Sequence, residues 1–357
     1  MRIVQIIDSL EVGGAERMAI NYANGLSNKI CFSGLVVTRK EGDLKSKIGK
    51  NVNYLFLNKK KTVDYKAVVK LKAYCKQNNI ELLQPHGSSY FIAFLVKLIY
   101  PKIQIIWHDH NGLSEFLSSQ KWIPLKIASY FFKGIIVVNY QLEIWAKKEL
   151  NCKEVVYLPN FTDNQVEIIS ETVLNGNLGK RIVCLANLRH QKNHLLLIEV
   201  AKKLKKTYPD WSFHLVGKDF EDDYSRELKN AIVANNLVNT VFLYGSRNDI
   251  VNIMNQSEIG VLTSRSEGLP LVLLEFGLHK KAIAVTNVGE IPLIVQDKKN
   301  GLLVPSENID MFYDSLAFLI ENPQTRELLG AALFKTIMKN NSQDVVFETY
   351  FKWLKEI

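Results

Sequence analysis

A predicted strand, loop and helix meet in the stretch Ser264–Glu275, which reads SRSEGLPLVLLE. The strand covers 259–264 and the helix 270–280, where Pro270 suits the first helical position because its fixed φ is compatible with a helix start. The loop then holds Glu267, and Glu275 lies about a turn and a half inside the helix. A strand followed by a helix in this way is the building unit of a parallel α/β sheet.

The same alternation extends in both directions from this stretch. Before residue 164, strands are predicted at 2–8, 31–38, 51–57, 81–86, 103–109, 135–140 and 156–160, with helices such as 15–27 between them. After residue 180, strands are predicted at 181–187, 212–217, 241–245, 259–264 and 282–287, with helices near 194–207, 222–236, 248–256, 270–280, 309–321 and 324–340. Two α/β domains with parallel, Rossmann-like sheets are therefore expected.

A polar segment separates the two alternating halves. Residues 164–180 contain Asn-Gly-Asn-Leu-Gly near their end, which is typical of a linker. We therefore expect one domain at 1–163 and a second at 181–341. Ligands of open parallel sheets bind outside the carboxyl ends of the strands, so the chemistry is expected in a cleft between the two facing domains.

The composition excludes several protein classes. Hydrophobic residues make up 47% and charged residues 23%, which is typical of a globular chain rather than a disordered or fibrous one. The four cysteines lie far apart without a Cys-x-x-Cys pair, which excludes a zinc ribbon and a dense disulfide framework. The apolar stretch 90–107 is interrupted by Lys97, Pro101 and Lys102, and the N-terminus reads as a strand rather than a signal peptide. A cytoplasmic or membrane-peripheral protein is expected.

Positive charge is concentrated in the first half. Residues 1–163 contain 23 Lys and Arg against 13 Asp and Glu, whereas residues 164–357 contain 22 against 23. This excess favours an anionic partner such as phosphate or a lipid headgroup, although a solvated lysine surface better explains scattered runs such as 59–61. The segment 116–134 fits either an interfacial helix on anionic lipid or a partly buried helix with snorkelling lysines. The lysines form no aromatic-interleaved stripe, so nucleic acid is not expected as a partner.

The first strand ends in a turn that contains Gly13 and Gly14. Adjacent glycines let the backbone approach a ligand closely, and the helix that follows directs its N–H groups and positive dipole end outward. This arrangement suits a diphosphate, whereas a Gly-Gly turn taken alone more often reflects loop geometry than function. It is neither the Gly-x-Gly-x-x-Gly dinucleotide motif nor a P-loop.

Glu267 and Glu275 place two carboxylates near the start of one helix. Both can contact hydroxyl groups of a ligand whose phosphates lie at the loop amides and the helix N-terminus. The alternative is that both are ordinary surface glutamates. Leu271 and the three apolar residues after it argue against that reading, because a carboxylate on a largely buried helix needs a reason.

Three histidines follow predicted strands. His108 and His110 flank Asp109 at the end of one strand, and alternation places both imidazoles on the same face. Two imidazoles and one carboxylate are too few ligands to assert zinc. His86, which ends another strand, is either a turn residue or a residue that lines the cleft, and the turn is favoured.

The chain resembles retaining glycosyltransferases of the GT-B fold, family 4, also called glycosyl transferases group 1. Glu267 and Glu275 match the family's Glu-x7-Glu motif, and the early Gly-Gly-Ala-Glu turn and the segments 286–292 (TNVGEIP) and 300–305 (NGLLVP) follow in the family's order. The resemblance covers nearly the whole chain. It implies two facing Rossmann-like domains with an interdomain cleft, and a C-terminal helix at 342–357 that returns to the first domain.

The resemblance also implies roles for individual residues. Glu267 would lie at the donor sugar, Glu275 would bind the ribose, and a basic pair would stabilise the leaving diphosphate. Lys192 matches the family lysine, whereas the family arginine stands where this chain has Asn187, so that Arg189 would have to act from two positions later. The remaining implied residues are His110 at the sugar and acceptor, the amides of Gly268, Leu269 and Leu271 at the sugar and diphosphate, and Gly13 and Gly14 at the phosphates.

The implied activity is retaining transfer of a sugar from a nucleoside-diphosphate sugar, with UDP favoured, to a saccharide or lipid-linked acceptor in surface polysaccharide biosynthesis. No metal site and no cofactor are expected, since the chain offers no compact Asp-x-Asp pair and the family generally works without a metal. Two alternatives stay open: a sugar-nucleotide epimerase of the same fold, and a non-catalytic nucleotide- or lipid-binding subunit that supports a partner transferase.

Overall fold

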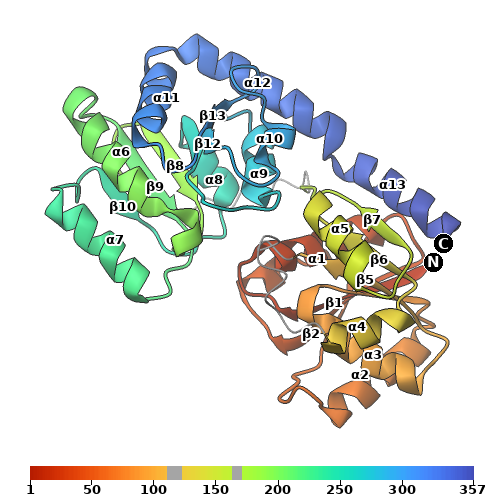
Figure 1. Ribbon diagram of the computed structural model, residues 1–357. Coiled ribbons are helices and arrows are strands. Elements are labelled where there is room, and N and C mark those ends of the chain that lie inside the picture. Colours follow the sequence, from red (N-terminus) through yellow and green to blue (C-terminus); the bar gives the residue numbers. More distant parts are fainter. Residues whose placement is uncertain (111–122, 163–170) are drawn as a thin grey trace. The chain divides into compact units, whose positions relative to one another are not determined.

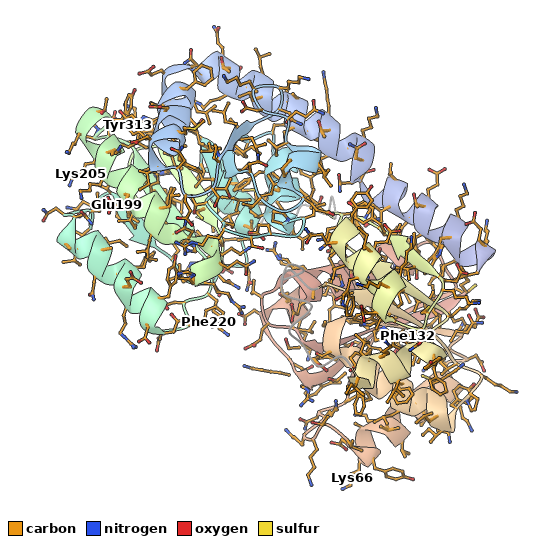
Figure 2. All side chains as sticks on the ribbon, in the orientation of Figure 1. Lys66, Phe132, Glu199, Lys205, Phe220 and Tyr313 are labelled. Atoms are coloured by element: carbon orange, nitrogen blue, oxygen red, sulfur yellow. The ribbon has the colours of Figure 1, made fainter. Side chains whose placement is uncertain are left out.

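The computed structural model describes residues 1–110, 123–162 and 171–357 (Figure 1). The chain divides into two compact units, the first formed by Met1–Asp163 together with Gln343–Ile357 and the second by Asn164–Ser342. Each unit contains one parallel β-sheet with helices packed against it, and Figure 2 shows the side chains on these elements. The expected α/β class with two Rossmann-like sheets is confirmed.

The sheet of the first unit has seven strands in the order β3-β2-β1-β4-β5-β6-β7. The strands are β1 (Arg2–Ser9), β2 (Phe32–Lys40), β3 (Asn53–Phe56), β4 (Leu82–Pro85), β5 (Gln104–Asp109), β6 (Gly134–Val137) and β7 (Val155–Tyr157). Strand residues alternate between two apolar cores: Val36 enters one core, and its neighbours Leu35 and Val37 enter the other. This alternation buries both faces of the sheet.

The helices of the first unit follow the strands in the manner of βαβ units. They are α1 (Gly14–Ser27), α2 (Tyr65–Gln77), α3 (Tyr90–Ile99), α4 (Ile123–Ala128) and α5 (Tyr140–Glu149), with short 3-10 turns η1 (Asp43–Lys47), η2 (Gly87–Ser89) and η4 (Ser129–Phe131). The C-terminal helix α13 (Gln343–Glu356) also belongs to this unit and buries Phe347, Tyr350 and Trp353 there. The segment 116–134 was expected to form either an interfacial helix or a partly buried one, and its residues 116–122 lie outside the described residues.

The sheet of the second unit has six strands in the order β10-β9-β8-β11-β12-β13. The strands are β8 (Arg181–Leu185), β9 (Ser212–Val216), β10 (Val241–Leu243), β11 (Ile259–Leu262), β12 (Ala282–Thr286) and β13 (Leu302–Val304). The helices are η5 (His190–Lys192, a 3-10 turn), α6 (His194–Thr207), α7 (Asp223–Ala234), α8 (Ile250–Asn255), α9 (Leu271–Leu278), α10 (Ile291–Ile294), α11 (Ile309–Glu321) and α12 (Pro323–Asn340). Ile182 and Cys184 enter one core and Val183 enters the other, so this sheet is also covered on both faces.

The linker predicted at 164–180 is too long at its C-terminal end. The Asp249 carboxylate accepts hydrogen bonds from the backbone N–H groups of Glu171 (3.0 Å) and Thr172 (2.6 Å). The Arg181 guanidinium donates to the carbonyls of Leu174 (2.7 Å) and Gly176 (2.9 Å). Residues 171–176 are therefore fixed to the second unit, and residues 164–170 lie outside the described residues.

Pro270 differs from its predicted place by one residue. Its ψ of 129° is extended, so it caps α9, which begins at Leu271. The change is small, and the loop that carries Glu267 keeps its predicted position between β11 and α9.

Candidate functional site

The residues singled out from the sequence lie at the carboxyl edges of the two sheets, where the strand order reverses. In the first sheet the reversal falls between β1 and β4, which are followed by Gly13 and His86; in the second it falls between β8 and β11, which are followed by Lys192 and Glu267. Ligands of open α/β sheets bind at such reversal points because adjacent loops there diverge to opposite faces. Each unit therefore presents its candidate residues where its fold places a ligand.

An ion pair joins Lys192 and Glu267. The Lys192 ammonium donates to Glu267 Oε1, and the Ser264 hydroxyl donates to the same oxygen at 2.6 Å. The Glu267 side chain is only 6% exposed and the Lys192 side chain is 22% exposed. The structure thus brings together two residues 75 positions apart that the sequence predicts at one ligand.

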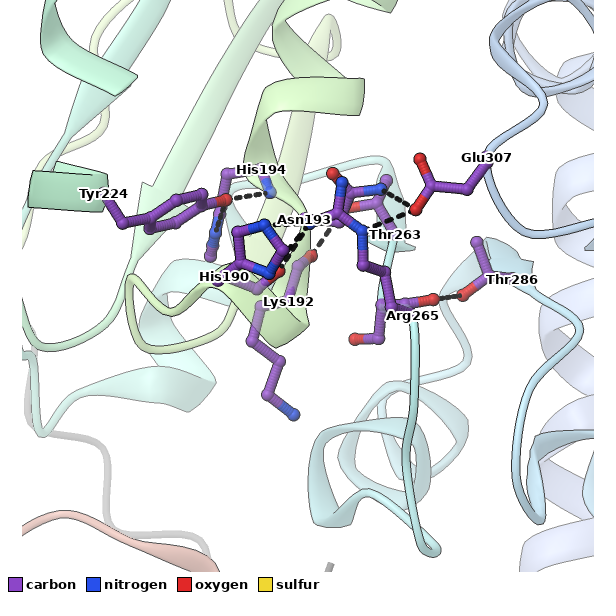
Figure 3. A network of polar contacts seen from close by, with 10 residues as sticks. His190, Lys192, Asn193, His194, Tyr224, Thr263, Arg265, Thr286 and Glu307 are labelled. Carbon is purple, nitrogen blue, oxygen red and sulfur yellow. Dashed lines mark hydrogen bonds and ion pairs between the residues drawn. The ribbon is translucent and has the colours of Figure 1, made fainter. Parts of the chain in front are cut away.

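Several hydrogen bonds lock the loop that carries Lys192 to the loop that carries Glu267. The Gln191 amide donates to the Ser266 carbonyl (2.7 Å), the Arg265 N–H to the Gln191 carbonyl (2.8 Å), and the Thr263 hydroxyl to the Lys192 carbonyl (3.0 Å). Figure 3 shows Lys192 and Thr263 within this network. The ion pair is therefore held by its backbone supports as well as by its own charges.

Further hydrogen bonds of Arg265 and Thr286 stabilise the same two loops. Arg265 lies between the His190 carbonyl, to which it donates at 3.0 Å, and the Glu307 carboxylate, which it contacts at 2.5 Å (Figure 3). The Thr286 hydroxyl donates to the Ser264 carbonyl at 2.7 Å. Thr286 begins the segment 286–292, one of the motifs that follow in the family's order. This segment thus packs directly on the loop of the ion pair.

Arg189 does not join this ion pair. Its guanidinium lies 4.7 Å from the centroid of the Phe220 ring, and the Lys218 ammonium lies 5.3 Å from the same ring. Asn187, at the position of the family arginine, accepts a hydrogen bond from the Lys218 N–H at 2.8 Å. Lys218 and Phe220 were missed from the sequence, because no motif marks the end of β9.

The residues of α9 and its preceding loop lie in two environments. Leu269 is buried, whereas Gly268 and Leu271 are half-buried, and the Gly268 carbonyl accepts from the Glu290 N–H at 3.4 Å. Glu275 is half-buried on a helix whose neighbouring residues Leu274 and Phe276 are fully buried. These positions do not test the expected roles. Contact of Glu275 with the ribose, and of the loop amides with the sugar and diphosphate, stays a prediction.

The turn at Gly13 and Gly14 already holds a carboxylate. Gly13 caps α1, and a Cβ built on it would lie 2.2 Å from Glu16 Oε2, so the Glu16 side chain folds back over the helix N-terminus. Ser9 donates to the other Glu16 oxygen at 3.3 Å. Burial raises the pKa of Glu16, with nearby Glu11 and Asp8 adding to the effect. A diphosphate at this turn would have to displace the Glu16 carboxylate.

The three histidines form one cluster with Gln5 and Gln84. His86 Nδ1 contacts His110 Nε2 at 2.7 Å, and the rings of His108 and His110 lie 4.0 Å apart between centroids. His86 and His108 are each 1% exposed, and His110 is partly buried. Burial lowers the pKa of His110 to about 3, so the imidazole is neutral at physiological pH. His86 directly precedes η2, and its carbonyl accepts from the Ser89 N–H at 3.2 Å, as expected of a turn residue. Its imidazole also belongs to this buried polar network, which the sequence did not predict.

Comparisons with known proteins agree with this architecture. Residues 166–335 match the family described as Glycosyl transferases group 1. The UDP-Gal:alpha-D-GlcNAc-diphosphoundecaprenol alpha-1,3-galactosyltransferase of Escherichia coli is 25% identical over 332 residues, which cover 85% of this chain and 84% of that protein. An uncharacterized glycosyltransferase of Haemophilus influenzae is 25% identical over 87% of this chain and 88% of its own. HepE of Anabaena, solved with UDP and glucose, shares 17% identity and a TM-score of 0.81 over 100% of both chains.

The two parallel-sheet units define the GT-B class of protein. The match to Glycosyl transferases group 1 lies in the second unit, and the relatives that cover most of the chain are glycosyltransferases, so the chain is a transferase enzyme. Within the described ranges, none of its helices combines the length and apolar character needed to cross a bilayer.

Proposed function

We propose that this glycosyltransferase moves a sugar, with retention of configuration, from a UDP-sugar to a saccharide or lipid-linked saccharide in surface polysaccharide biosynthesis. The observation that carries the proposal is the buried contact between Lys192 and Glu267 at the carboxyl edge of the second sheet. The names of relatives support the substrate classes: one is a UDP-Gal galactosyltransferase acting on a diphosphoundecaprenol-linked sugar, and others act in capsule and O-antigen biosynthesis.

In this proposal each functional group of the donor has a partner. Lys192, with Arg189 as a second cation, stabilises the charge that develops on the departing diphosphate. Glu267 contacts the sugar and Glu275 the ribose, while the amides around Gly268 contact the sugar and phosphates. No metal is assigned to the reaction.

Chemically, the sugar C1–O bond to the phosphate breaks while the acceptor oxygen bonds to C1 on the same face. The acceptor proton passes to the departing phosphate oxygen, so no enzymatic nucleophile is required. His110 of the first unit is assigned to the sugar or the acceptor, and the Gly13-Gly14 turn to the phosphates.

The test is a transfer assay with a panel of UDP-sugars and diphospholipid-linked saccharide acceptors, with UDP release and product both measured. We expect one UDP-sugar to give product whose new linkage keeps the donor's anomeric configuration, as read from its C1–H1 coupling. Epimerised UDP-sugar formed without acceptor would indicate the epimerase. UDP binding without turnover in any acceptor panel would indicate the non-catalytic subunit.

Peripheral membrane contact is the second part of the proposal. The exposed apolar residues of α3, α4 and η4 are Leu98, Ile99, Ile123, Ile127, Tyr130 and Phe131. The described part of this region, 90–110 and 123–133, also carries four lysines and only one acidic residue, the buried Asp109. Apolar side chains flanked by lysines suit the surface of an anionic membrane.

Flotation with vesicles containing phosphatidylglycerol tests this contact. The double substitution Ile123→Ser and Ile127→Ser should reduce binding, because both side chains are exposed on α4. The matched control, Val233→Ser and Val238→Ser, removes exposed apolar side chains from the second unit and should leave binding unchanged. Equal binding of both double variants would contradict the membrane contact.

A further inference from the structure

A continuous polar network runs through the interior of the first unit to His110. Tyr350 of α13 contacts Gln84 Oε1 at 2.7 Å, and Gln84 Nε2 contacts His108 Nδ1 at 3.2 Å. Gln5 joins Gln84 to His86, and His86 in turn contacts His110. Every member except His110 is at most 1% exposed, so water does not compete for these contacts.

The amides determine the direction of each hydrogen bond, because an amide oxygen only accepts and an amide nitrogen only donates. Gln5 Nε2 faces Gln84 Oε1 at 3.3 Å, which leaves Gln5 Oε1 facing His86 Nε2 at 2.7 Å. His86 Nε2 must therefore carry a proton. Burial lowers the pKa of His86, so its imidazole is neutral and carries only this one proton. His86 Nδ1 therefore accepts, and His110 donates to it from Nε2 at 2.7 Å.

The Tyr350 hydroxyl selects this direction over the opposite one. Turning both amides would reverse every donor in the network together. It would also point a Gln84 N–H group at Tyr350, whose O–H would then have no acceptor among the described residues. Because Tyr350 has no exposed surface, an unpaired O–H there carries a desolvation cost. The direction chosen above also leaves one donor unpaired, the N–H on His108 Nε2, which has no partner within the described residues. The 2.7 Å between the Tyr350 hydroxyl and Gln84 Oε1 decides between the two, because it is the usual length of an O–H···O bond and is shorter than the usual N–H···O bond.

We infer that this network places the single proton of the neutral His110 imidazole on Nε2, so that Nδ1 is a bare hydrogen-bond acceptor for a sugar or acceptor hydroxyl. Gln5, Gln84, His86 and Tyr350 are then positioning residues. The use of Nδ1 rests on the proposed function, whereas the proton's place on Nε2 does not. The C-terminal helix acquires a role beyond packing, since it supplies the hydroxyl that orients the network.

The same geometry argues against a metal ion at the three histidines, although their ring nitrogens lie within 4.8 Å of one another. Ligand nitrogens about 2.0–2.1 Å from a tetrahedral zinc are roughly 3.3 Å apart. His86 Nδ1 and His110 Nε2 are separated by only 2.7 Å. His108 Nδ1 accepts from Gln84, so the proton of His108 occupies Nε2, the nitrogen that would have to face the ion.

The test is imidazole ¹⁵N NMR of the full chain with ring-labelled histidine at neutral pH, the His110 signals being assigned with His110→Gln. In the wild type we expect a neutral His110 protonated on Nε2 only. His86→Asn keeps a hydrogen-bond acceptor near the position of His86 Nδ1 and should preserve the Nε2-protonated tautomer of His110. His86→Leu removes the acceptor and should give a mixture of tautomers, as should Tyr350→Phe. His194, which lies in the second unit, serves as the internal control and should not change.

Activity provides a separate readout. If Nδ1 contacts a substrate hydroxyl, His86→Leu should lower kcat/KM about tenfold, the value of roughly one hydrogen bond, and His86→Asn should restore most of it. Should His86→Leu fail to fold, Tyr350→Phe and Gln5→Leu take its place.

Three results would overturn the inference: an imidazolium at neutral pH, a wild-type His110 protonated on Nδ1, or uptake of one Zn²⁺ per chain that shifts all three histidines. The NMR result stands even if no transferase activity is found, so failure of the inference and failure of the proposed function are distinguishable.

Discussion

Gly289 lies against the carbonyl of Glu267 so closely that a Cβ built on it would be 1.8 Å from the carbonyl oxygen. Its φ of +55° also favours glycine. The segment after β12 thereby supports the back of the loop that presents the Glu267 carboxylate to Lys192. No side chain fits between the two backbones, so the position of Glu267 depends on a glycine 22 residues away.

Gly289→Ala should displace the Glu267 loop and lower both stability and activity. The matched control is Gly179→Ala, which has a φ of +82° but no neighbouring atom within 4 Å of its Cβ. Left-handed strain alone costs about 1–2 kcal/mol, so the control should lose about that much free energy of unfolding and keep its activity. Urea unfolding and turnover measure the difference. Equal effects at both glycines would show that the contact with Glu267 is unimportant.

Separating the partners of the ion pair should cost stability as well as activity. Either Lys192→Met or Glu267→Gln leaves one charge without its partner in a largely buried position, and we expect a loss of about 1–3 kcal/mol. The double variant should recover part of that stability while remaining inactive, because Lys192 is needed for the leaving diphosphate. Denaturant melts of all four proteins give the coupling free energy. A double variant with near wild-type turnover would contradict the catalytic role of the pair.

Glu16→Gln should strengthen the binding of pyrophosphate if the Gly13-Gly14 turn holds phosphates. The carboxylate at the helix N-terminus repels an anion, and the amide does not. Because burial raises the pKa of Glu16, the wild type should bind pyrophosphate more tightly as the pH falls through that raised pKa. Glu16→Gln should flatten this dependence, as calorimetric titration between pH 5 and 8 would show. Unchanged affinity in the variant would place the phosphates elsewhere.

Asp249 should tie the start of the second unit to its core. Burial disfavours its charged form, but hydrogen bonds from Thr172, Asn252 and Glu171 outweigh that effect and lower the pKa of Asp249 to about 2. This depressed pKa contributes stability above the unfolded value near 3.8, and the contribution is lost as the pH falls toward 2. Asp249→Asn should cost about 2 kcal/mol and speed proteolytic cleavage near 171–176 at neutral pH. Cleavage there at the wild-type rate would contradict the assignment.

Hydrophobic alternation predicted most of the fold because strands and helices in these sheets have different apolar periods. Helices α6 and α11 begin and end at the predicted residues, 194–207 and 309–321. The strand β13 was missed: Leu302–Val304 is too short for a periodic signal, and its pairing with β12 provides the stabilisation that its sequence does not reveal.

The candidate site was less predictable than the fold. Glu267 and Lys192 were found through motifs, whereas the histidine network was not, since Gln5 and His86 are 81 residues apart and meet only because β4 pairs with β1. Likewise, the place of Glu16 over Gly13 depends on a side-chain rotamer, which the sequence does not specify.

The most direct test of the central claim is a thermal-shift comparison of UDP, GDP, ADP and CMP on the wild type and on Glu275→Ala. Glu227→Ala, an exposed glutamate of α7 in the same unit, is the matched control. A nucleotide at a hundred times its Kd stabilises by about 2.7 kcal/mol, which is readily measured. We predict that UDP alone shifts the wild type and the control, and that Glu275→Ala loses the shift. A shift with a different nucleotide, or an undiminished UDP shift in Glu275→Ala, would contradict the account.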